Sequence, residues 1–150
     1  MTVKKILTKE EKRNRAISVS VGIIVAALVS HQFATNTGYS DKALIAEARQ
    51  TNEWLKKHPA EAEVKDILRI DSFSVPESKV FVEHITAYVT KDEANNDTIK
   101  KYINPGLLNN IKTNPQLKVA RKYGITFVHL FNDINGEVFY TYTVTPDMYK

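Results

Sequence analysis

The sequence predicts a small α+β domain that follows a single N-terminal transmembrane helix. Three observations lead to this prediction: an uncharged stretch near the N-terminus, segments of helical pattern in the middle, and two β-rich runs joined by a tight turn near the C-terminus. The expected sheet is antiparallel, has three or more strands and packs against the helices.

The composition is that of a folded domain. Hydrophobic residues make up 43% and charged residues 25% of the 150 residues, and there is no cysteine. The chain beyond the anchor, about 110 residues, is long enough to bury a core without disulfides. The lack of cysteine excludes thiol catalysis and zinc–thiolate sites.

The net charge of +4 is concentrated in the N-terminal tail. Residues 1–15 contain six of the 21 basic and two of the 17 acidic residues, so 15 of each remain in residues 16–150. A domain without net charge lacks the electrostatic field that attracts phosphates. We therefore expect no nucleic-acid partner.

Residues 16–34 (AISVSVGIIVAALVSHQFA) form the predicted anchor in the lipid bilayer. The strongly apolar part, residues 16–29, is shorter than the ~20 residues that span a hydrocarbon core, and the polar residues 30–32 are expected among the headgroups. The basic residues precede this stretch, so the positive-inside rule places the tail, residues 1–15, in the cytoplasm and the domain on the far side.

Two alternatives remain for this stretch. A cleaved signal peptide also has a basic start and an apolar core, but cleavage after Ala34 would put Gln32 where a small residue is needed. A buried core helix is the second alternative, because the apolar part is short for a membrane span.

A linker is expected over residues 35–40, and the domain over residues 41–150. Ser40 is a suitable N-cap for a helix that runs to about His58. Pro59 ends that helix or begins a short one, for which residues 60–68 are suited.

A loop is then expected over residues 71–78, followed by a strand over residues 79–90, which are rich in β-branched and aromatic side chains. Residues 98–103 suit a helix that Asn104-Pro105-Gly106 interrupts, and residues 107–111 suit a further helical piece.

The strongest local signals lie in the last third of the chain. Asn114-Pro115 predicts a helix start and Gly124 a helix end. The β-rich runs 125–132 and 137–145 flank Asn135-Gly136, a turn pair typical of β-hairpins.

The same part of the chain, roughly residues 64–150, resembles a family of small exported bacterial proteins of unassigned function. The matching short motifs are Thr113-Asn114-Pro115, Gly124-Ile125-Thr126, Asp133-Ile134-Asn135-Gly136 and Val144-Thr145-Pro146. Members of that family often carry a cysteine pair; the corresponding places here hold Lys112 and residues 147–150. The resemblance implies an envelope location and no particular reaction, and with the predicted anchor it suggests a single-pass protein of the inner membrane with a periplasmic domain.

His84 and His129 are candidate ligand-binding or acid–base residues, because imidazole titrates near neutral pH. They lie in different predicted strands, and the adjacent Glu83 is a further acid; if the strands pair, the two imidazoles could lie close together. A histidine pair without a nucleophile or an orienting carboxylate is a weak site, and the simpler interpretation is that both are half-buried sheet residues. We expect no catalytic residue, no metal and no cofactor.

Tyr140 and Tyr142 are the other candidates, as part of an aromatic binding strip with Tyr149, although packing beneath helices is the favoured interpretation of the first two. Asp133 precedes a tight turn and is expected to bind its own backbone there.

The predicted function is that of a non-enzymatic protein-interaction module, held in the bilayer through residues 16–34 and bound to another envelope protein. A small envelope enzyme, or an inhibitor of one, is an alternative that requires His84, His129 and an acid within hydrogen-bond reach in an open pocket. A small-ligand or lipid-binding domain is another, and it requires an enclosed apolar cavity.

Overall fold

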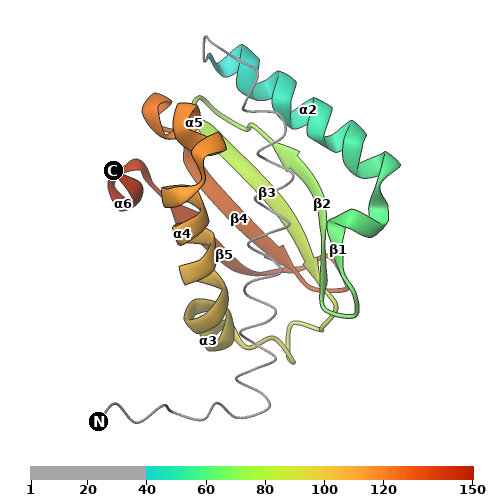
Figure 1. Cartoon of the computed structure of the whole chain (residues 1–150). Helices are drawn as coiled ribbons and strands as arrows, with labels where there is room; N and C mark the ends of the chain where they lie inside the picture. The colour runs from blue at the N-terminus through green and yellow to red at the C-terminus, as the bar shows by residue number, and fades with distance from the viewer. Residues whose placement is uncertain (1–39) are drawn as a thin grey trace, which may run out of the picture.

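Five strands form one mixed sheet in the computed structural model, which describes residues 40–150 (Figure 1). The strands are β1 (Glu63–Val64), β2 (Leu68–Ser74), β3 (Val80–Ala87), β4 (Thr126–Asn132) and β5 (Val138–Val144). They lie side by side in chain order. The pairs β1–β2, β2–β3 and β4–β5 are antiparallel, but β3–β4 is parallel. The α+β prediction is therefore confirmed, whereas the prediction of a purely antiparallel sheet was wrong at the centre.

The parallel pair follows from the helical connection between β3 and β4. This connection consists of α3 (Asn96–Thr98), η2 (Ile99–Ile103), α4 (Asn104–Thr113), η3 (Pro115–Leu117) and α5 (Lys118–Tyr123). It carries the chain back along the sheet to the end where β3 began, as Figure 1 shows. A strand that starts again from the same end must run parallel to its neighbour.

The first described helix, α2 (Asp41–Lys57), agrees with the prediction. Its N-cap is Ser40, whose hydroxyl accepts a hydrogen bond from the Ala43 N–H at 3.2 Å. Asp41 joins this helix end to the β2–β3 turn, because its carboxylate accepts bonds from the Ser78 hydroxyl (2.7 Å) and the Lys79 N–H (3.0 Å). These two bonds hold the pKa of Asp41 below its usual value.

The segment after α2 differs from the prediction. Instead of a helix over residues 60–68, the chain makes the short turn η1 (Pro59–Ala62) and then the β1–β2 hairpin. Instead of a loop over residues 71–78, most of β2 lies there. The register of β2 against β3 shifts between Ile70 and Ser72, and this irregularity interrupts the simple alternation of buried and exposed residues that would have indicated a strand.

The helical connection also continues through the proline at which the sequence predicted an interruption. Pro105 occupies the first turn of α4, where no N–H donor is required. The turn before it, η2, is π-helical. A wider turn next to a proline lets the chain remain helical without the bond that proline cannot donate.

The C-terminal predictions are confirmed. Asn114 caps η3 through a bond from the Gln116 N–H at 3.0 Å, and Gly124 ends α5 with φ of +81°. Gly136 lies in the β4–β5 turn with φ of +85°. The short helix α6 (Pro146–Tyr149) then closes the fold, with the Tyr149 hydroxyl donating to the Ile125 carbonyl oxygen at 2.6 Å.

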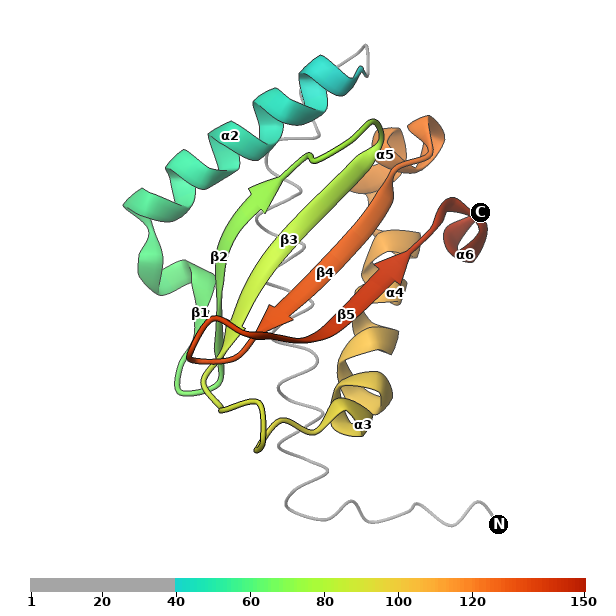
Figure 2. The ribbon, with the colours of Figure 1, turned by 180° about the vertical axis from the view of Figure 1, so that it is seen from behind.

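The hydrophobic core lies on one face of the sheet. Alternation along the strands points Phe81 and Ile85 of β3, and Phe127 and Phe131 of β4, to this face. Buried side chains of α2 and α4 belong to the same core: Leu44, Ala48, Leu55, Leu107 and Ile111. Viewed from behind, strands β2 to β5 are seen without a described helix in front of them (Figure 2).

Within residues 40–150, no helix is both long and apolar enough to cross a membrane. The predicted tail, anchor and nearly all of the predicted linker, which together cover residues 1–39, lie outside the described part of the chain.

Candidate functional site

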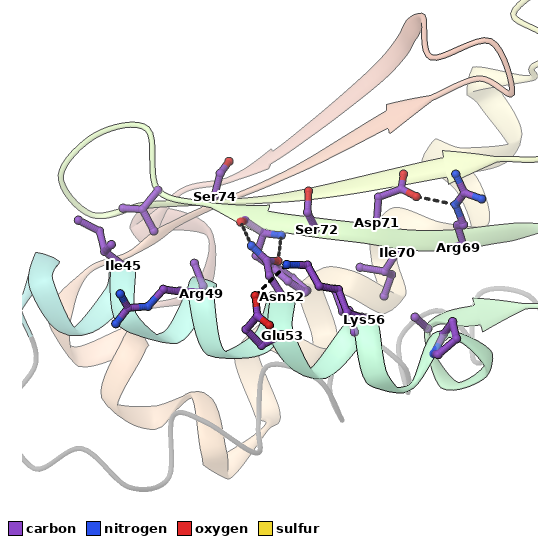
Figure 3. Close-up of a pocket in the computed structure, with 16 residues that line it drawn as sticks. Ile45, Arg49, Asn52, Glu53, Lys56, Arg69, Ile70, Asp71, Ser72 and Ser74 are labelled. Carbon is purple, nitrogen blue, oxygen red and sulfur yellow. Dashed lines mark hydrogen bonds and ion pairs between the residues drawn. The ribbon is translucent and has the colours of Figure 1, made fainter.

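A groove of about 700 Å³ runs between α2 and β2 (Figure 3). We call it the α2–β2 groove. Its apolar lining comes from both elements and from the segments that follow them: Ile45, Ala48, Leu55, Ala62, Ile70 and Val75. Ile45 is 55% exposed and is one of three large hydrophobic side chains that the described surface exposes. A groove of this size is comparable to sites that bind small molecules or short peptide segments.

The groove exists because β1 covers only the beginning of β2. β1 pairs with Leu68 and Arg69, so along residues 70–74 no described strand lies on the outer side of β2. α2 covers this edge, and Asn52 binds both backbone polar groups of Phe73. The Phe73 N–H donates to Asn52 Oδ1 at 2.7 Å, and Asn52 Nδ2 donates to the Phe73 carbonyl oxygen at 2.8 Å. One amide side chain thus takes the place of a neighbouring strand at this point.

The charged residues of the groove are partly paired. Lys56 Nζ lies 2.8 Å from Glu53, and Arg69 Nε lies 2.6 Å from Asp71. Arg49 also lines the groove, and no carboxylate between residues 40 and 150 pairs with it. The groove therefore has an apolar floor and one uncompensated cation at its rim.

A second hollow, of about 570 Å³, adjoins the groove on α2. Arg49 and Glu53 line both. The hollow also contains Trp54, whose ring stacks on that of His58 at 4.4 Å between centroids. Trp54 is partly buried and packs against the core, yet it also reaches this surface.

A buried acid–histidine pair lies on the core face of the sheet. Because β3 and β4 run parallel in register, Glu83 lies beside His129. His129 Nδ1 and Glu83 Oε2 are 2.6 Å apart, with the ring N–H donating to the carboxylate, and both side chains are only 3% exposed. The Tyr142 ring stacks on His129 at 6.1 Å between centroids.

The space next to this pair is small. A cavity of about 10 Å³ is lined by Glu83 and His129, by Asn110 and Ile111 of α4, and by neighbouring core side chains. It can hold one water molecule but no larger substrate. The remaining polar atoms of three lining residues, Glu83 Oε1, His129 Nε2 and Asn110 Nδ2, have no hydrogen-bond partner among the described residues.

His84 lies on the opposite face of the sheet from His129. Its register partner on β4 is Leu130, and its Nε2 is 2.9 Å from the Ser74 hydroxyl. The two strands do pair, as the sequence allowed, but the parallel register places the two imidazoles on opposite faces. The possible proximity of His84 and His129 is therefore not realised, and Glu83 is the partner of His129.

Tyr140 and Tyr142 point to the core face, consistent with packing beneath the helices. The Tyr140 hydroxyl accepts a bond from Asn104 Nδ2 at 2.7 Å, and its ring packs against Phe131. Burial, and secondarily the neighbouring Tyr140, raises the pKa of Tyr142. Neither tyrosine lines the α2–β2 groove.

Sequence reasoning identified Glu83 and His129 as separate candidates but did not predict the groove. Arg49 is exposed and Asn52 is half-buried against β2, and neither residue type on a helix indicates a groove by itself. The one available signal was the apolar Ile45 directly beside Leu44, but only the structure shows that Leu44 is buried while Ile45 is 55% exposed. Among residues 40–150, no three His, Asp or Glu side chains are grouped as metal ligands.

The fold resembles that of a solved bacterial protein. A candidate secreted protein of Pseudomonas aeruginosa superimposes with a TM-score of 0.54 over 77% of this chain and 100% of its own chain, at 8% sequence identity. AspS, the type II secretion system pilotin of Vibrio cholerae, superimposes with a TM-score of 0.48 over 71% of this chain and 93% of its own, at 13% identity. At such low identity, the first likeness shows a shared fold and no shared activity.

No known family and no curated protein matches the sequence. The similarity is thus to the fold of one secreted bacterial protein, and the narrower family resemblance drawn from the motifs of residues 113–146 stays an expectation.

Proposed function

We propose that this chain is a membrane-anchored protein of the bacterial envelope whose periplasmic domain binds another protein without catalysing a reaction. We further propose that the α2–β2 groove receives a short apolar segment of that partner, with an acidic group placed against Arg49. The groove itself carries the proposal, because it is a hollow of about 700 Å³ with a largely apolar lining, at which the side chain of Ile45 is 55% exposed.

The chemistry of the rim supports a protein partner. Arg49 and Trp54 of α2 both line the hollow that adjoins the groove. Arginine and tryptophan are among the residues that contribute most to binding at protein interfaces. An arginine that pairs with no carboxylate among residues 40–150 also favours a segment that brings its own negative charge.

The bonds of Asn52 suggest how the segment binds. Both backbone groups of Phe73 are already occupied by the Asn52 amide. A partner strand could not form ladder bonds at that residue without displacing Asn52. We therefore expect the segment to bind mainly by burying its apolar side chains over Ile45 and Ala48, and not by extending the sheet.

The other functions considered have less support. For the enzyme alternative, the space next to the Glu83–His129 pair is about 10 Å³, far smaller than a substrate site requires. The envelope location is supported by the basic tail and the uncharged stretch 16–34 of the sequence.

A peptide selection tests the proposal directly. The full-length protein in detergent micelles would be used to select from a displayed library of short random peptides, and the affinity of each selected peptide would be measured by fluorescence anisotropy. Apolar peptides with an acidic residue should be enriched, and Ile45→Asp and Arg49→Glu should each weaken their binding by about tenfold or more.

The matched control is Thr141→Asp, which places a charge on an exposed residue of β5 far in sequence from the groove. It should leave binding unchanged. Peptides that bind the Ile45→Asp and Arg49→Glu proteins as well as they bind the unmodified protein would contradict the proposed use of the groove.

A further inference from the structure

The charges of the domain are distributed unevenly along the chain. Residues 40–150 contain 15 basic and 15 acidic residues, but the stretch from Thr98 to Asn132 contains six basic residues and no acidic one. All six belong to the helical connection between β3 and β4: Lys100, Lys101, Lys112, Lys118, Arg121 and Lys122. A domain without net charge therefore has regions of strong and opposite charge.

One end of the domain combines part of this basic stretch with two other segments. The start of α2, the β2–β3 turn and the end of α5 meet there, as Figure 1 shows. The Tyr123 hydroxyl of α5 lies 3.4 Å from Asp41 of α2, and the ammonium group of Lys79 lies 4.7 Å from the centre of the Tyr123 ring. We call this the basic end, and its cations are Lys42, Lys79, Lys118, Arg121 and Lys122.

Few carboxylates compensate the basic end. Asp41 and Glu77 are the acidic residues of its three segments, and Asp41 already binds the β2–β3 turn. The neighbouring helix α6 adds Asp147 and Lys150, whose side chains have opposite charges. The four lysines of the basic end are exposed, and no carboxylate among residues 40–150 forms an ion pair with them.

The opposite end of the sheet is acidic. The turns and connections that meet there contain eight acidic and two basic residues, in the ranges 61–67, 88–97 and 133–137. Hydrogen bonds hold these segments together, for example from the Tyr88 hydroxyl to Glu63 at 2.8 Å and from the Lys91 N–H to Asp133 at 3.0 Å. We call this the acidic end. The excess of acidic residues exceeds the charge of Lys100 and Lys101, which follow in η2.

The chain enters the domain at the basic end. Ser40 caps the first turn of α2, and the proposed anchor ends at residue 34. Six residues reach at most about 20 Å even when fully extended, so the basic end must lie near a bilayer that holds residues 16–34. Salt screens charges over about 8 Å under physiological conditions, a length comparable to this separation.

We propose that the basic end rests against anionic phospholipid headgroups of that bilayer. The inference depends on the membrane anchor of the proposed function and goes beyond it, because an anchor alone does not determine which side of the domain faces the lipid. Lysine clusters next to a membrane segment are attracted to anionic lipids. The same surface repels the acidic end, so both ends favour one orientation, which would also fix the direction of α2 and its groove.

Energy transfer between the domain and the lipid tests this contact. The chain has no cysteine, so a fluorophore can be attached at Gln116→Cys, an exposed position two residues before Lys118. The labelled full-length protein would be reconstituted into vesicles with a headgroup-labelled acceptor lipid. Energy transfer should be about twofold or more stronger in phosphatidylcholine–phosphatidylglycerol vesicles than in phosphatidylcholine alone, and high salt should remove the difference.

Charge reversal provides the matched comparison. The double substitution Lys118→Glu and Lys122→Glu should reduce the energy transfer with phosphatidylglycerol to the value in phosphatidylcholine. Lys65→Glu with Lys91→Glu makes the same change in net charge at the acidic end and should leave the transfer high. A fluorophore at Asp92→Cys, an exposed position of the acidic end, should show weaker transfer than one at position 116.

Three results would overturn the inference: equal transfer from position 116 in both kinds of vesicle, equal or stronger transfer from position 92 with phosphatidylglycerol, or an effect of phosphatidylglycerol that survives the reversal of both lysines. Washing the vesicles at high pH tests the anchor separately. A protein that stays in the vesicles but shows one of these results contradicts the headgroup contact alone, whereas a protein that washes off contradicts the anchor and the contact together.

Discussion

The carboxylate of Asp133 binds three backbone N–H groups, two in the turn between β4 and β5 and one in the chain after β3. Its two oxygens accept bonds from the N–H groups of Asn135 (2.9 Å), Glu137 (2.8 Å) and Lys91 (3.0 Å). The first two bonds close the turn, as expected from the sequence, while the third fixes the chain after β3 to the hairpin. Asp133 is 1% exposed, so its charge depends on these donors.

The same bonds determine how Asp133 titrates. Burial by itself would raise the pKa of Asp133, but the N–H donors of Glu137, Lys91 and Asn135 together outweigh it and lower the pKa below the usual value. A carboxylate with a lowered pKa in the folded state stabilises the fold above the pKa it has in the unfolded chain, and this contribution is lost as the pH falls through the folded pKa.

We therefore expect Asp133→Asn to destabilise the domain at neutral pH, and the difference from the unmodified protein to shrink as the pH falls below about 4. Urea unfolding followed by circular dichroism from neutral to strongly acidic pH measures this difference. Asp92→Asn changes an exposed aspartate of the preceding turn and serves as the control. A difference that is the same at every pH would contradict the role assigned to the Asp133 charge.

At the residue scale, the sequence indicated which polar side chains lie on the core face of the sheet. It did not indicate which of these side chains contact each other. Glu83 has Phe81 and Ile85 two positions away on either side, and His129 has Phe127 and Phe131. In a strand, this pattern places each polar residue on the apolar face. The pattern is visible without a structure, but the contact of Glu83 with His129 depends on the register of two strands about 40 residues apart in the chain, which no local signal fixes.

At the scale of elements, the features with strong local signals were predicted correctly. Ser40 at the start of α2, Asn114-Pro115 at η3 and Gly124 after α5 lie where the sequence placed them. β2 was missed because its irregularity falls in a stretch of aspartate and serine that resembles a loop. The short strand β1 has two residues and gives no periodic signal at all.

Substitution of Gly124 tests the account of the C-terminal end of α5. Its φ of +81° is unfavourable for any residue with a Cβ, although a Cβ built at this position would meet no atom within 4 Å. Gly124→Ala should therefore destabilise the domain by about 1–2 kcal/mol through backbone conformation alone. Gly124→Asn should cost less, because asparagine tolerates this conformation better. Chemical denaturation of the three proteins measures the order, and equal stability of all three would contradict the account of this helix end.

At the scale of the whole molecule, the relative direction of β3 and β4 was the feature that local patterns could not predict. The sequence predicted helices between the strands that are now β3 and β4, and a connection of that length allows the two strands to run parallel. The antiparallel assumption came from the β4–β5 hairpin, which is local. The centre of the sheet, where β3 and β4 run parallel, is also where the Glu83–His129 pair lies.

The topology of the chain is a prediction at the same scale. A reporter enzyme that is active only outside the cytoplasm, fused after Lys150, should be active, and the fusion should remain full length in the membrane fraction. A soluble product shorter by about 30 residues would indicate a cleaved signal peptide and favour a secreted protein. An inactive reporter on a stable product would contradict the envelope location.

The central claim is that the α2–β2 groove binds a protein partner, and site-specific photo-crosslinking in intact cells tests it most directly. A photoreactive amino acid at position 45, in the groove, should form a discrete adduct with one envelope protein. The adduct should disappear when Arg49→Glu is introduced, and the same amino acid at position 141 should form none. No adduct at position 45, or the same adduct from both positions, would contradict the claim.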